Sequence, residues 1–569
     1  MISRSYTCGV GDDSMLHLSI PERLDQCAEE YPEREAYVFL TAKSESRLLR
    51  EAISYRDLAH TSRNVAASLL DLELNPCDRL AVLSGNCPEW IILEYAALRC
   101  KLLLIRIDQE KVTVKSLIEQ IVEYKCKAVI VNGRRDDRIT RLVCGMFIRR
   151  HVESGERKTG GRVIGLIRDS QSGLVTIENL AESNICQAKL DEIQGSIDAD
   201  DVAVVMTSSE STGNEKNLFQ YSHFSIINNC RSLGGVIDVD ESAIYFDYSS
   251  FSRPGYSIFV SLSFGISAIY LDPSLLNNSD HVFAILEQEK VSFGTFSTHL
   301  LDCCCQKWAA CEREILPNCL RYVLVRDVYL IDEEVIHYLK REQKTVVSLY
   351  TTDYTLVAAT ASRSYKDDDI QYRPLPGVQM KVVNGNGNVL PVEHPGLLMV
   401  KSPLASVGHL EEDSGHDDVT DWYETRDVAS ISENGRITII DLSVDVIRHG
   451  SLKIYPSLIE KQLRCLPEVI NSGVVGVPRD ATQQDVYACV VVTSGSRMTV
   501  DYFMQLCERL KVNGKLDCSF KYVKIIEHDS LTAVDGELSK KISWQYPTVD
   551  RYLSRSRLIM LMMEDLNRK

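Results

Sequence analysis

Thiols are the side chains in this sequence whose number and spacing first suggest chemistry. The chain contains 18 cysteines among 569 residues, and Cys303, Cys304 and Cys305 are consecutive. No two cysteines stand in a C-x-x-C arrangement, so the spacing favours neither a zinc ribbon nor a thioredoxin-like motif. We therefore predict mostly buried thiols in a reducing compartment. A cysteine-based redox sensor stays as an alternative that rests on residues 303–305 alone.

The overall composition bounds the class of protein. Hydrophobic residues make up 44% and charged residues 25% of the chain, which excludes a disordered or low-complexity chain. Lys plus Arg total 63 against 80 Asp plus Glu, so the net charge is −17, and no nucleic-acid partner is expected. No run reaches the ~18 unbroken apolar residues of a membrane span, and the best candidate, at 256–271, contains four serines. The first residues show neither an apolar secretory segment nor a long Arg-rich leader, which predicts a cytoplasmic protein.

Helical and strand-like patterns alternate along most of the chain. Apolar spacing predicts helices at 24–30, 58–72, 88–99 and 222–233, and apolar runs predict strands at 79–84, 127–132 and 202–206. Continuous apolar strands between helices are typical of parallel sheets that are covered on both faces. From about residue 382 to 400 the strands become short and rich in turns, with a hairpin signal at 384–388. A compact βα segment follows, so we expect a domain boundary near residues 442–445.

Several short stretches, in order and at matching spacing, carry a resemblance to a known family. They are Ser5 to Gly9, Pro32 to Ala36, Asp78-Arg79-Leu80 with Glu89-Trp90, Ser222-His223-Phe224 with Asn228-Asn229, and Val474 to Pro478. Over roughly 5–553 the chain resembles the adenylate-forming (AMP-binding) superfamily of acyl-CoA synthetases, luciferases and peptide-synthetase adenylation domains, and most of all its medium-chain acyl-CoA synthetases.

The resemblance implies an α/β fold. A large N-terminal AMP-binding domain, residues 1–441, would contain mostly parallel sheets covered by helices and a small β-barrel-like subdomain. A small, mobile α+β C-terminal lid domain, residues 442–569, would follow. A fold of this kind does not by itself establish an activity.

The resemblance also implies an ATP- and CoA-dependent ligase for a fatty acid or another carboxylic acid, with Mg²⁺. Such enzymes join the carboxylate to AMP and then pass the acyl group to the CoA thiol. The first step brings one anion onto another, so it needs backbone N–H groups, a cation and Mg²⁺ around the phosphates. The second step needs the C-terminal domain to rotate on a hinge.

The stretch that matches the family's phosphate loop keeps hydroxyls but loses glycines. The residues implied to contact the phosphates are Ser208, Ser209, Ser211, Thr212, Gly213 and the catalytic Lys216. Glu210 and Asn217 replace two glycines, which are used where backbone must come close to phosphate, and Glu215 replaces a proline. Each added carboxylate repels a solvated triphosphate by about 1 kcal/mol. Two interpretations stay open, a weakened ATP loop and a serine-rich surface loop without a ligand.

Two further motifs fall on residues 350–353 and 425–427. Thr352 matches the position that holds the α-phosphate, and Asp353 replaces a Mg²⁺-binding Glu by a shorter hard oxygen ligand. Tyr350 replaces a glycine beside the acyl pocket, so we expect its ring to fill space that a substrate needs. Asp427 matches the residue that holds the ribose hydroxyls, because two carboxylate oxygens suit two neighbouring donors. The alternative for Thr352, Asp353 and Asp427 is that these side chains bind no ligand.

The hinge and C-terminal motifs have lost positive charge. Asp445 matches the hinge aspartate, whereas Leu442 replaces an Arg that contacts the ribose and Val444 replaces a Lys. Glu537 aligns with the catalytic Lys that binds the carboxylate and the α-phosphate. Losing one such stabiliser costs ~10²–10³ in rate, and a reversed charge should cost more.

The acyl site departs from the family as well. The family's aromatic–His pair is Phe251-Ser252 here, so no His is left at this position. With the changes elsewhere, this predicts a ligase with impaired or lost adenylation. The alternative is a catalytically inactive protein that binds a nucleotide, an acyl-CoA or a protein partner. An intermediate possibility is a protein that transfers the acyl group of a preformed acyl-adenylate to the CoA thiol but does not form the adenylate. For the location, the alternative to the cytoplasm is the mitochondrion, as in related synthetases.

Overall fold

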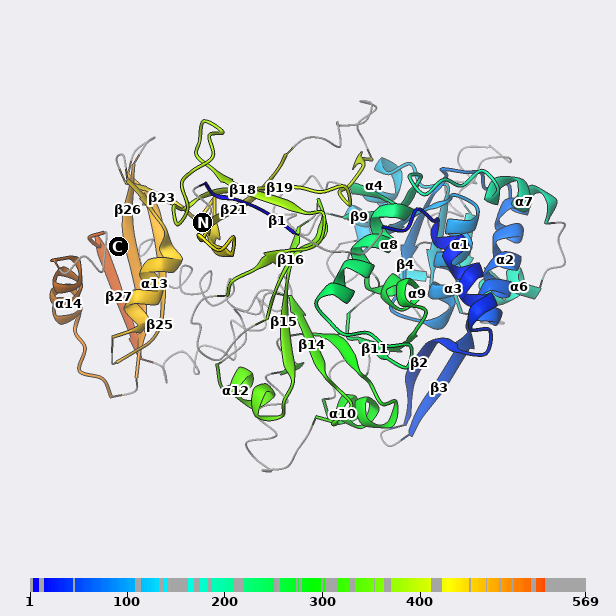
Figure 1. Cartoon of the computed structure of the whole chain (residues 1–569), viewed down its shortest axis with the longest axis horizontal. Helices are drawn as coiled ribbons and strands as arrows, with labels where there is room; N and C mark the ends of the chain where they lie inside the picture. Colours follow the sequence, from blue (N-terminus) through cyan, green and yellow to red (C-terminus); the bar gives the residue numbers. More distant parts are fainter. Residues whose placement is uncertain are drawn as a thin grey trace.

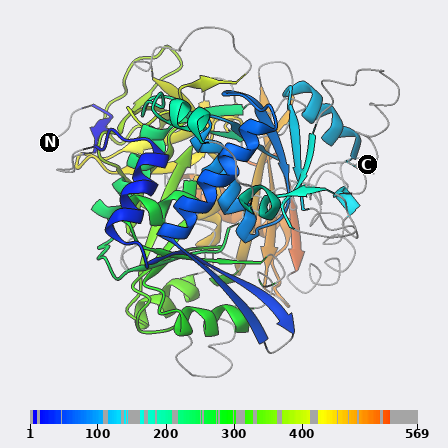
Figure 2. The same cartoon turned by 90° about the vertical axis from the view of Figure 1, so that its right-hand side faces the viewer.

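The fold is that of an elongated molecule whose C-terminal elements lie at one end (Figure 1). This computed structural model describes residues 4–9, 15–44, 47–107, 114–132, 138–140, 143, 162–167, 174–182, 187–207, 218–249, 251, 256–272, 275, 279–297, 300–301, 316–326, 333–352, 354–362, 370–410, 422–449, 452–466, 468–479, 483–493, 495–512 and 518–527. Figure 2 views the molecule from its opposite end, where the N-terminal helices, coloured blue, stand in front of the strands.

The first of two large sheets is mostly parallel. Its eight strands are, in spatial order, β20 (Gly408–His409), β10 (Leu218–Ser222), β9 (Val202–Thr207), β5 (Leu103–Arg106), β4 (Arg79–Leu83), β6 (Ala128–Val131), β7 (Arg162–Gly165) and β8 (Val175–Thr176). The pairs from β9 through β8 are parallel, and β10 runs antiparallel to both of its neighbours.

The second large sheet has a parallel centre and antiparallel edges. Its nine strands are, in spatial order, β17 (Arg373–Pro374), β16 (Leu356–Ser362), β15 (Thr345–Thr352), β14 (Tyr322–Arg326), β13 (Phe293–Phe296), β11 (Ile244–Asp247), β12 (Ser267–Leu271), β2 (Glu35–Ser44) and β3 (Arg47–Ser54). The strands from β15 through β2 are parallel to one another, so their carboxyl ends lie at one edge of the sheet.

Helices cover both faces of the two large sheets because alternate strand residues point to opposite faces. Leu80 of β4 and Tyr245 of β11 share one buried cluster with residues of α1 (Ile20–Glu30), α2 (Tyr55–Asp71), α3 (Pro88–Arg99), α8 (His223–Ser232) and α9 (Val260–Phe264). The neighbouring Ala81 packs with α4 (Val114–Glu123), and Phe246 packs with α10 (Ser279–Gln288) and α12 (Glu333–Arg341). Four further short helices are α6 (Ile177–Glu182), α7 (Ala188–Gln194), η1 (Leu233–Gly235) and η2 (Tyr256–Phe259).

A third sheet is antiparallel throughout. Its five strands are, in spatial order, β1 (Tyr6–Cys8), β18 (Gln379–Val383), β19 (Gly396–Lys401), β21 (Tyr423–Ile431) and β22 (Ile437–Leu442). The turn after β18 closes with a hydrogen bond from Asn384 N to Asn388 O (2.9 Å), and Gly387 adopts φ +78°, which favours glycine. β1 brings the N-terminal segment beside strands of the last third of the chain (Figure 1).

The C-terminal elements have a core of their own. They are β23 (Ile447–His449), β24 (Leu452–Ile454), α13 (Pro456–Arg464), β25 (Val469–Pro478), β26 (Gln484–Val492), α14 (Val500–Val512) and β27 (Tyr522–Glu527). Leu463, Val490 and Phe503 belong to one buried cluster that is separate from those of the large sheets. The Glu460 carboxylate of α13 accepts a hydrogen bond from Val474 N of β25 (2.8 Å), which ties the helix to the sheet. Rotation of this part about Asp445 stays a prediction.

The predicted α/β architecture, with mostly parallel sheets and a turn-rich antiparallel part, is confirmed. Helix α1 begins earlier than the predicted residue 24, because Ser19 and Glu22 form a capping box in front of it. None of the described helices combines the length and the apolar character that crossing a bilayer would require.

Candidate functional site

The structure describes only part of the predicted site. Outside the described residues lie Ser208, Ser209, Ser211, Thr212, Gly213, Lys216, Ser252, Asp353 and Glu537. Within them lie Phe251, Tyr350, Thr352, Asp427, Leu442 and Asp445. The site can therefore be built around the ends of β15, β21 and β22.

A hydrogen bond joins two of the predicted site residues. The Tyr350 hydroxyl donates to Asp427 Oδ2, although the two residues are 77 positions apart in the sequence. Tyr350 lies on β15, where the register of the β15–β16 pair shifts, and Asp427 lies on β21 of the antiparallel sheet. The Tyr350 side chain is 9% exposed, and its ring centroid is 5.7 Å from that of Tyr372. The phenol thus occupies a buried position against the carboxylate.

The surroundings of Tyr350 keep its phenol protonated. Burial, followed by the negative charge of Asp427, raises the pKa of Tyr350 well above its ordinary value. The phenol therefore keeps its proton at neutral pH and acts as the donor. Thr425 supports the carboxylate's backbone, because Asp427 N donates to Thr425 Oγ1 (3.2 Å) and that hydroxyl donates to Leu398 O (3.0 Å).

Leu442 is the residue directly opposite Asp427 in the β21–β22 pair. Side chains at such positions have Cβ atoms ~4.5–5.5 Å apart, so a charged side chain at position 442 would interact with the carboxylate. Leucine offers neither a charge nor a hydrogen-bond donor. Ser443 N donates to Arg426 O (2.7 Å) and Asp445 N donates to Leu442 O (3.0 Å), which closes the turn that follows β22.

The Thr352 hydroxyl is engaged within its own turn. Thr355 N donates to Thr352 Oγ1 (2.9 Å), and the two threonine hydroxyls are also 2.9 Å apart. Thr355 is fully buried, and Leu356 after it adopts φ +55°, a left-handed conformation. The bond from Thr355 N uses a lone pair of Thr352 Oγ1 and leaves its hydroxyl hydrogen, so a phosphate at Thr352 would compete only with the contact between the two hydroxyls.

Phe251, predicted for the acyl pocket, lies in the hydrophobic core. Its ring is 1% exposed and makes edge contacts with Trp90 (5.9 Å between centroids) and Tyr270 (5.0 Å). Its backbone N–H donates to Asn86 Oδ1 (2.7 Å). These contacts fix the ring, and its role towards an acyl chain stays a prediction.

Asp247, at the carboxyl end of β11, was missed by the sequence analysis. It is 1% exposed, and its Oδ1 accepts hydrogen bonds from Ser249 N (2.9 Å) and Ser249 Oγ (2.7 Å). Among the described residues, Oδ2 has no hydrogen-bond partner. An aspartate at the end of an apolar parallel strand is the signal that could have found it, because ligands of α/β sheets bind at these ends.

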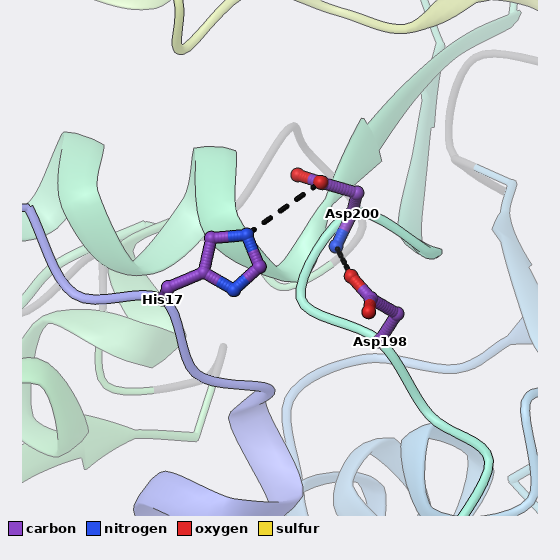
Figure 3. A group of neighbouring side chains, drawn as sticks. All are labelled: His17, Asp198 and Asp200. Carbon is purple, nitrogen blue, oxygen red and sulfur yellow. Dashed lines mark hydrogen bonds and ion pairs between the residues drawn. The ribbon is translucent and has the colours of Figure 1, made fainter.

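A group of possible metal ligands lies on the surface, away from the predicted residues in the sequence. His17, Asp198 and Asp200 each offer one atom, and these atoms lie within 4.8 Å of one another (Figure 3). His17 Nε2 is 3.6 Å from Asp200 Oδ2, and Asp198 Oδ1 accepts a hydrogen bond from Asp200 N (3.0 Å). All three side chains are exposed, and Asp198 already serves its own turn, so we interpret the group as a surface ion pair.

In the part of the site that the structure describes, the side chains that the resemblance assigns to a nucleotide bond to other residues of the chain. The carboxylate expected to hold the ribose is hydrogen-bonded to Tyr350, and the hydroxyl expected at the α-phosphate is bonded to Thr355. The position expected to add a cation is occupied by Leu442.

Comparisons with known proteins agree with the resemblance found in the sequence. A family model described as "AMP-binding enzyme" matches residues 24–409. The medium-chain acyl-CoA ligase ACSF2, mitochondrial, of Danio rerio is 23% identical over 574 residues, which cover 95% of this chain and 90% of that protein.

Solved structures show the same fold. The O-succinylbenzoate coenzyme A synthetase of Bacillus subtilis in complex with ATP and a magnesium ion has a TM-score of 0.66 at 16% identity, covering 89% of this chain and 95% of that one. A fatty acyl CoA synthetase of Mycobacterium tuberculosis has a TM-score of 0.66 at 19% identity, covering 89% and 94%.

Proposed function

Because the chain belongs to the AMP-binding enzyme family, we propose that it is an acyl-CoA synthetase-type protein whose adenylation step is weak or lost. The ancestral reaction in this proposal is the ATP- and CoA-dependent activation of a fatty acid, through an acyl-adenylate. The name of the Danio rerio relative supports a ligase and a medium-chain substrate. ATP, Mg²⁺ and CoA are the family's ligands, and their binding by this chain is what experiments have to measure.

The contact between Tyr350 and Asp427 is the observation that carries the proposal. A buried phenol that donates to the carboxylate fills the place where ribose hydroxyls would donate. A ribose would therefore have to displace both the hydrogen bond and the ring. The Asp427 carboxylate already accepts a hydrogen bond from Tyr350, and this lowers the affinity for any ligand that must bond to the same carboxylate.

The sequence adds independent support from elsewhere in the chain. Glu537 stands where the family has the cation for the carboxylate and the α-phosphate, and Glu210 stands in the phosphate loop. An acid in place of a cation reverses the sign of the interaction with a developing anion. Several such changes act on one step, so the adenylation half-reaction is the step that we expect to fail.

The second candidate function is binding without turnover. The scaffold around the site is intact, because Tyr350 and Tyr372 pack together and Thr425 holds the strand that bears Asp427. A fold that keeps its packing but loses its charged chemistry can serve as a binding module for an acyl-CoA or a protein. Asp427 itself favours a residual enzyme, because it is the one nucleotide-contacting carboxylate that the sequence retains.

ATP–pyrophosphate exchange tests the proposal directly. The assay uses the purified chain, Mg²⁺ and a panel of short- to long-chain fatty acids, with the natural protein, Glu537→Lys, Tyr350→Gly and the double variant. We expect exchange to rise most in the double variant, because each single variant retains the obstacle that the other removes, while Leu442 and the phosphate loop are the same in all of them. Tyr372→Phe is the matched control for loss of a buried phenol hydroxyl next to the site.

The outcomes separate the candidate functions. Exchange by the natural protein well above background would refute impaired adenylation. Recovery by Glu537→Lys alone would show that the ribose position is accessible after all. Silence of every variant, each shown to be folded, would mean that the phosphate loop has decayed as well and would favour the binding module.

We propose the cytoplasm as the compartment, with the mitochondrion as the alternative. The described cysteines are free thiols, which supports a reducing environment. The name of the Danio rerio relative supports the mitochondrion. Subcellular fractionation distinguishes the two.

A further inference from the structure

A cleft of about 650 Å³ lies between the antiparallel sheet and the C-terminal elements. One wall comes from β18, β19 and β21, and the other comes from the turn after β22, from β23 and β24, and from Pro478, Gln483 and Gln484 at the ends of β25 and β26. Small-molecule sites have volumes of ~300–1,000 Å³, so the cleft has the size of such a site. Tyr350, Thr352 and Asp427 do not line it, so it is separate from the nucleotide position.

Two cations face each other in this cleft. Arg448 and Lys453 are directly opposite residues of the β23–β24 pair, and both line the cleft. Like charges at directly opposite positions destabilise a pair of strands. In the part of the chain that the structure describes, neither side chain forms a salt bridge or donates a side-chain hydrogen bond. Their charges therefore remain available to a ligand.

The remaining charge in the cleft does not cancel the two cations. Glu424, on the opposite wall, is the one acidic residue among those that line the cleft, so one positive charge is left over. The neighbouring His449 is held by a hydrogen-bonding contact between Nδ1 and Gln484 O (2.9 Å). The whole chain has a net charge of −17, so a cleft with excess positive charge is a local exception. A bound anion would neutralise this charge.

Apolar side chains form part of the walls around the cations. The apolar residues that line the cleft are Val383, Leu397, Val428, Val444, Val446 and Pro478. Val444, on the turn after β22, lines the cleft and is 78% exposed, so its side chain is accessible to a ligand. Burying apolar surface of this kind stabilises a complex by ~25 cal/mol per Å². The cleft thus combines an anion-binding end with an apolar wall.

We propose that this cleft binds an amphipathic oxyanion, that is, an apolar chain with a carboxylate or phosphate head. The head lies between Arg448 and Lys453, where a guanidinium and an ammonium donate charge-assisted hydrogen bonds. The chain lies along Val444 and the other apolar wall residues. Because the walls belong to both parts of the molecule, the ligand contacts both and favours the relative orientation seen here. This site does not depend on the proposed function, because it shares no residue with the nucleotide position.

Isothermal titration calorimetry of the full chain tests the site. The ligands are decanoate and decyl phosphate, used below their micelle-forming concentrations, with decanol and inorganic phosphate as the apolar and the anionic half alone. We expect both amphiphiles to bind more tightly than either half. Whichever head binds more tightly identifies the carboxylate or the phosphate as the natural one.

Charge variants assign the binding to the cleft. Arg448→Gln and Lys453→Gln should each weaken binding by roughly 10- to 100-fold, because each removes a hydrogen bond to a charged group. Arg448→Lys keeps the charge and should retain most of the affinity. Arg497→Gln is the matched control, because Arg497 is an exposed arginine of the same C-terminal part that does not line the cleft.

Three results would overturn the proposal. The first is no binding of either amphiphile to the folded protein. The second is binding of decanol or inorganic phosphate as tight as that of the amphiphiles. The third is amphiphile binding that Arg448→Gln and Lys453→Gln leave unchanged, since this would place the ligand in the acyl pocket of the family fold instead.

Discussion

Replacing Tyr350 should open the ribose position, and the expected gain in nucleotide affinity can be worked out from its contacts. A nucleotide that uses Asp427 must first break the hydrogen bond from the phenol. A hydrogen bond to a charged group contributes about 1.5–3 kcal/mol. Moving the buried ring into water costs about 1.5–3 kcal/mol more. The sum of about 3–6 kcal/mol corresponds to roughly 10²–10⁴ in affinity.

Two substitutions separate the two contributions. Tyr350→Phe removes the hydroxyl and keeps the ring, so it should raise the affinity for AMP by roughly 10- to 100-fold at most. Tyr350→Gly also removes the ring and should recover the larger part of the gain. It leaves a cavity and should destabilise the fold by about 3–5 kcal/mol, so each variant has to be shown to be folded by its thermal unfolding curve first.

The assay is calorimetric titration with AMP, because AMP tests the ribose and α-phosphate positions without the rest of the phosphate loop. Tyr372→Phe is the matched control, since its hydroxyl bonds with Ser348 Oγ (2.8 Å) rather than with Asp427. Adding Asp427→Asn to Tyr350→Gly should abolish the gain. Micromolar AMP binding by the natural chain, or equal affinities for natural protein and both Tyr350 variants, would refute the reasoning.

Three further predictions concern protonation, thiols and a buried ion pair. Burial lowers the pKa of His223 from 6.5 to about 4, so the free energy of unfolding is highest above pH 6.5 and falls as the pH drops towards 4, by about 2 kcal/mol at pH 5. His223→Gln should make the midpoint of thermal unfolding less dependent on pH between 7 and 5, and an unchanged pH dependence would contradict this. Burial raises the pKa of the Cys230 thiol to about 12, so a thiol reagent should label Cys230 far more slowly than the exposed Cys8, as measured by mass spectrometry. Equal labelling rates would contradict the burial of Cys230. Glu94 and Arg106 form a buried ion pair (2.6 Å), so Glu94→Gln, which leaves the arginine without its partner charge, should lower the free energy of unfolding by about 3–5 kcal/mol. Replacing both residues by Leu should lower it less, and a larger loss for the double variant in thermal melts would be inconsistent with this reasoning.

Local elements of this fold can be predicted from the sequence because their signals are local. Helix α3 occupies the predicted residues 88–99, since Pro88 suits the first helical turn and the apolar residues that follow are buried. The earlier start of α1 also has a local signal, the Ser19 and Glu22 capping box, although it lies before the periodic residues. The parallel architecture follows from apolar strands alternating with helices.

The contact at the heart of the site has no local signal. The sequence predicts that the Tyr350 ring fills space, but its hydroxyl contacts Asp427 of another sheet, next to a register shift of β15 between Tyr350 and Thr351. A shift of one residue turns a strand's side chains to the other face, so such a contact depends on packing across two sheets. The two facing cations were not predicted from the sequence either, because their juxtaposition depends on the register of the β23–β24 pair.

The residues at positions 442 and 350 both determine which groups surround the Asp427 carboxylate. Residue 442 is opposite Asp427, so an arginine there would give the carboxylate a cation. Leu442 offers this half-buried carboxylate no cation, and taking a charge partly out of water costs free energy unless other groups bond to it. Tyr350 donates a hydrogen bond to the carboxylate from the neighbouring sheet. We therefore expect the Tyr350 hydroxyl to stabilise the carboxylate where position 442 supplies no cation. Opening position 350 alone would return the carboxylate to a ribose, whereas the full electrostatic environment of a nucleotide site also needs a cation at position 442.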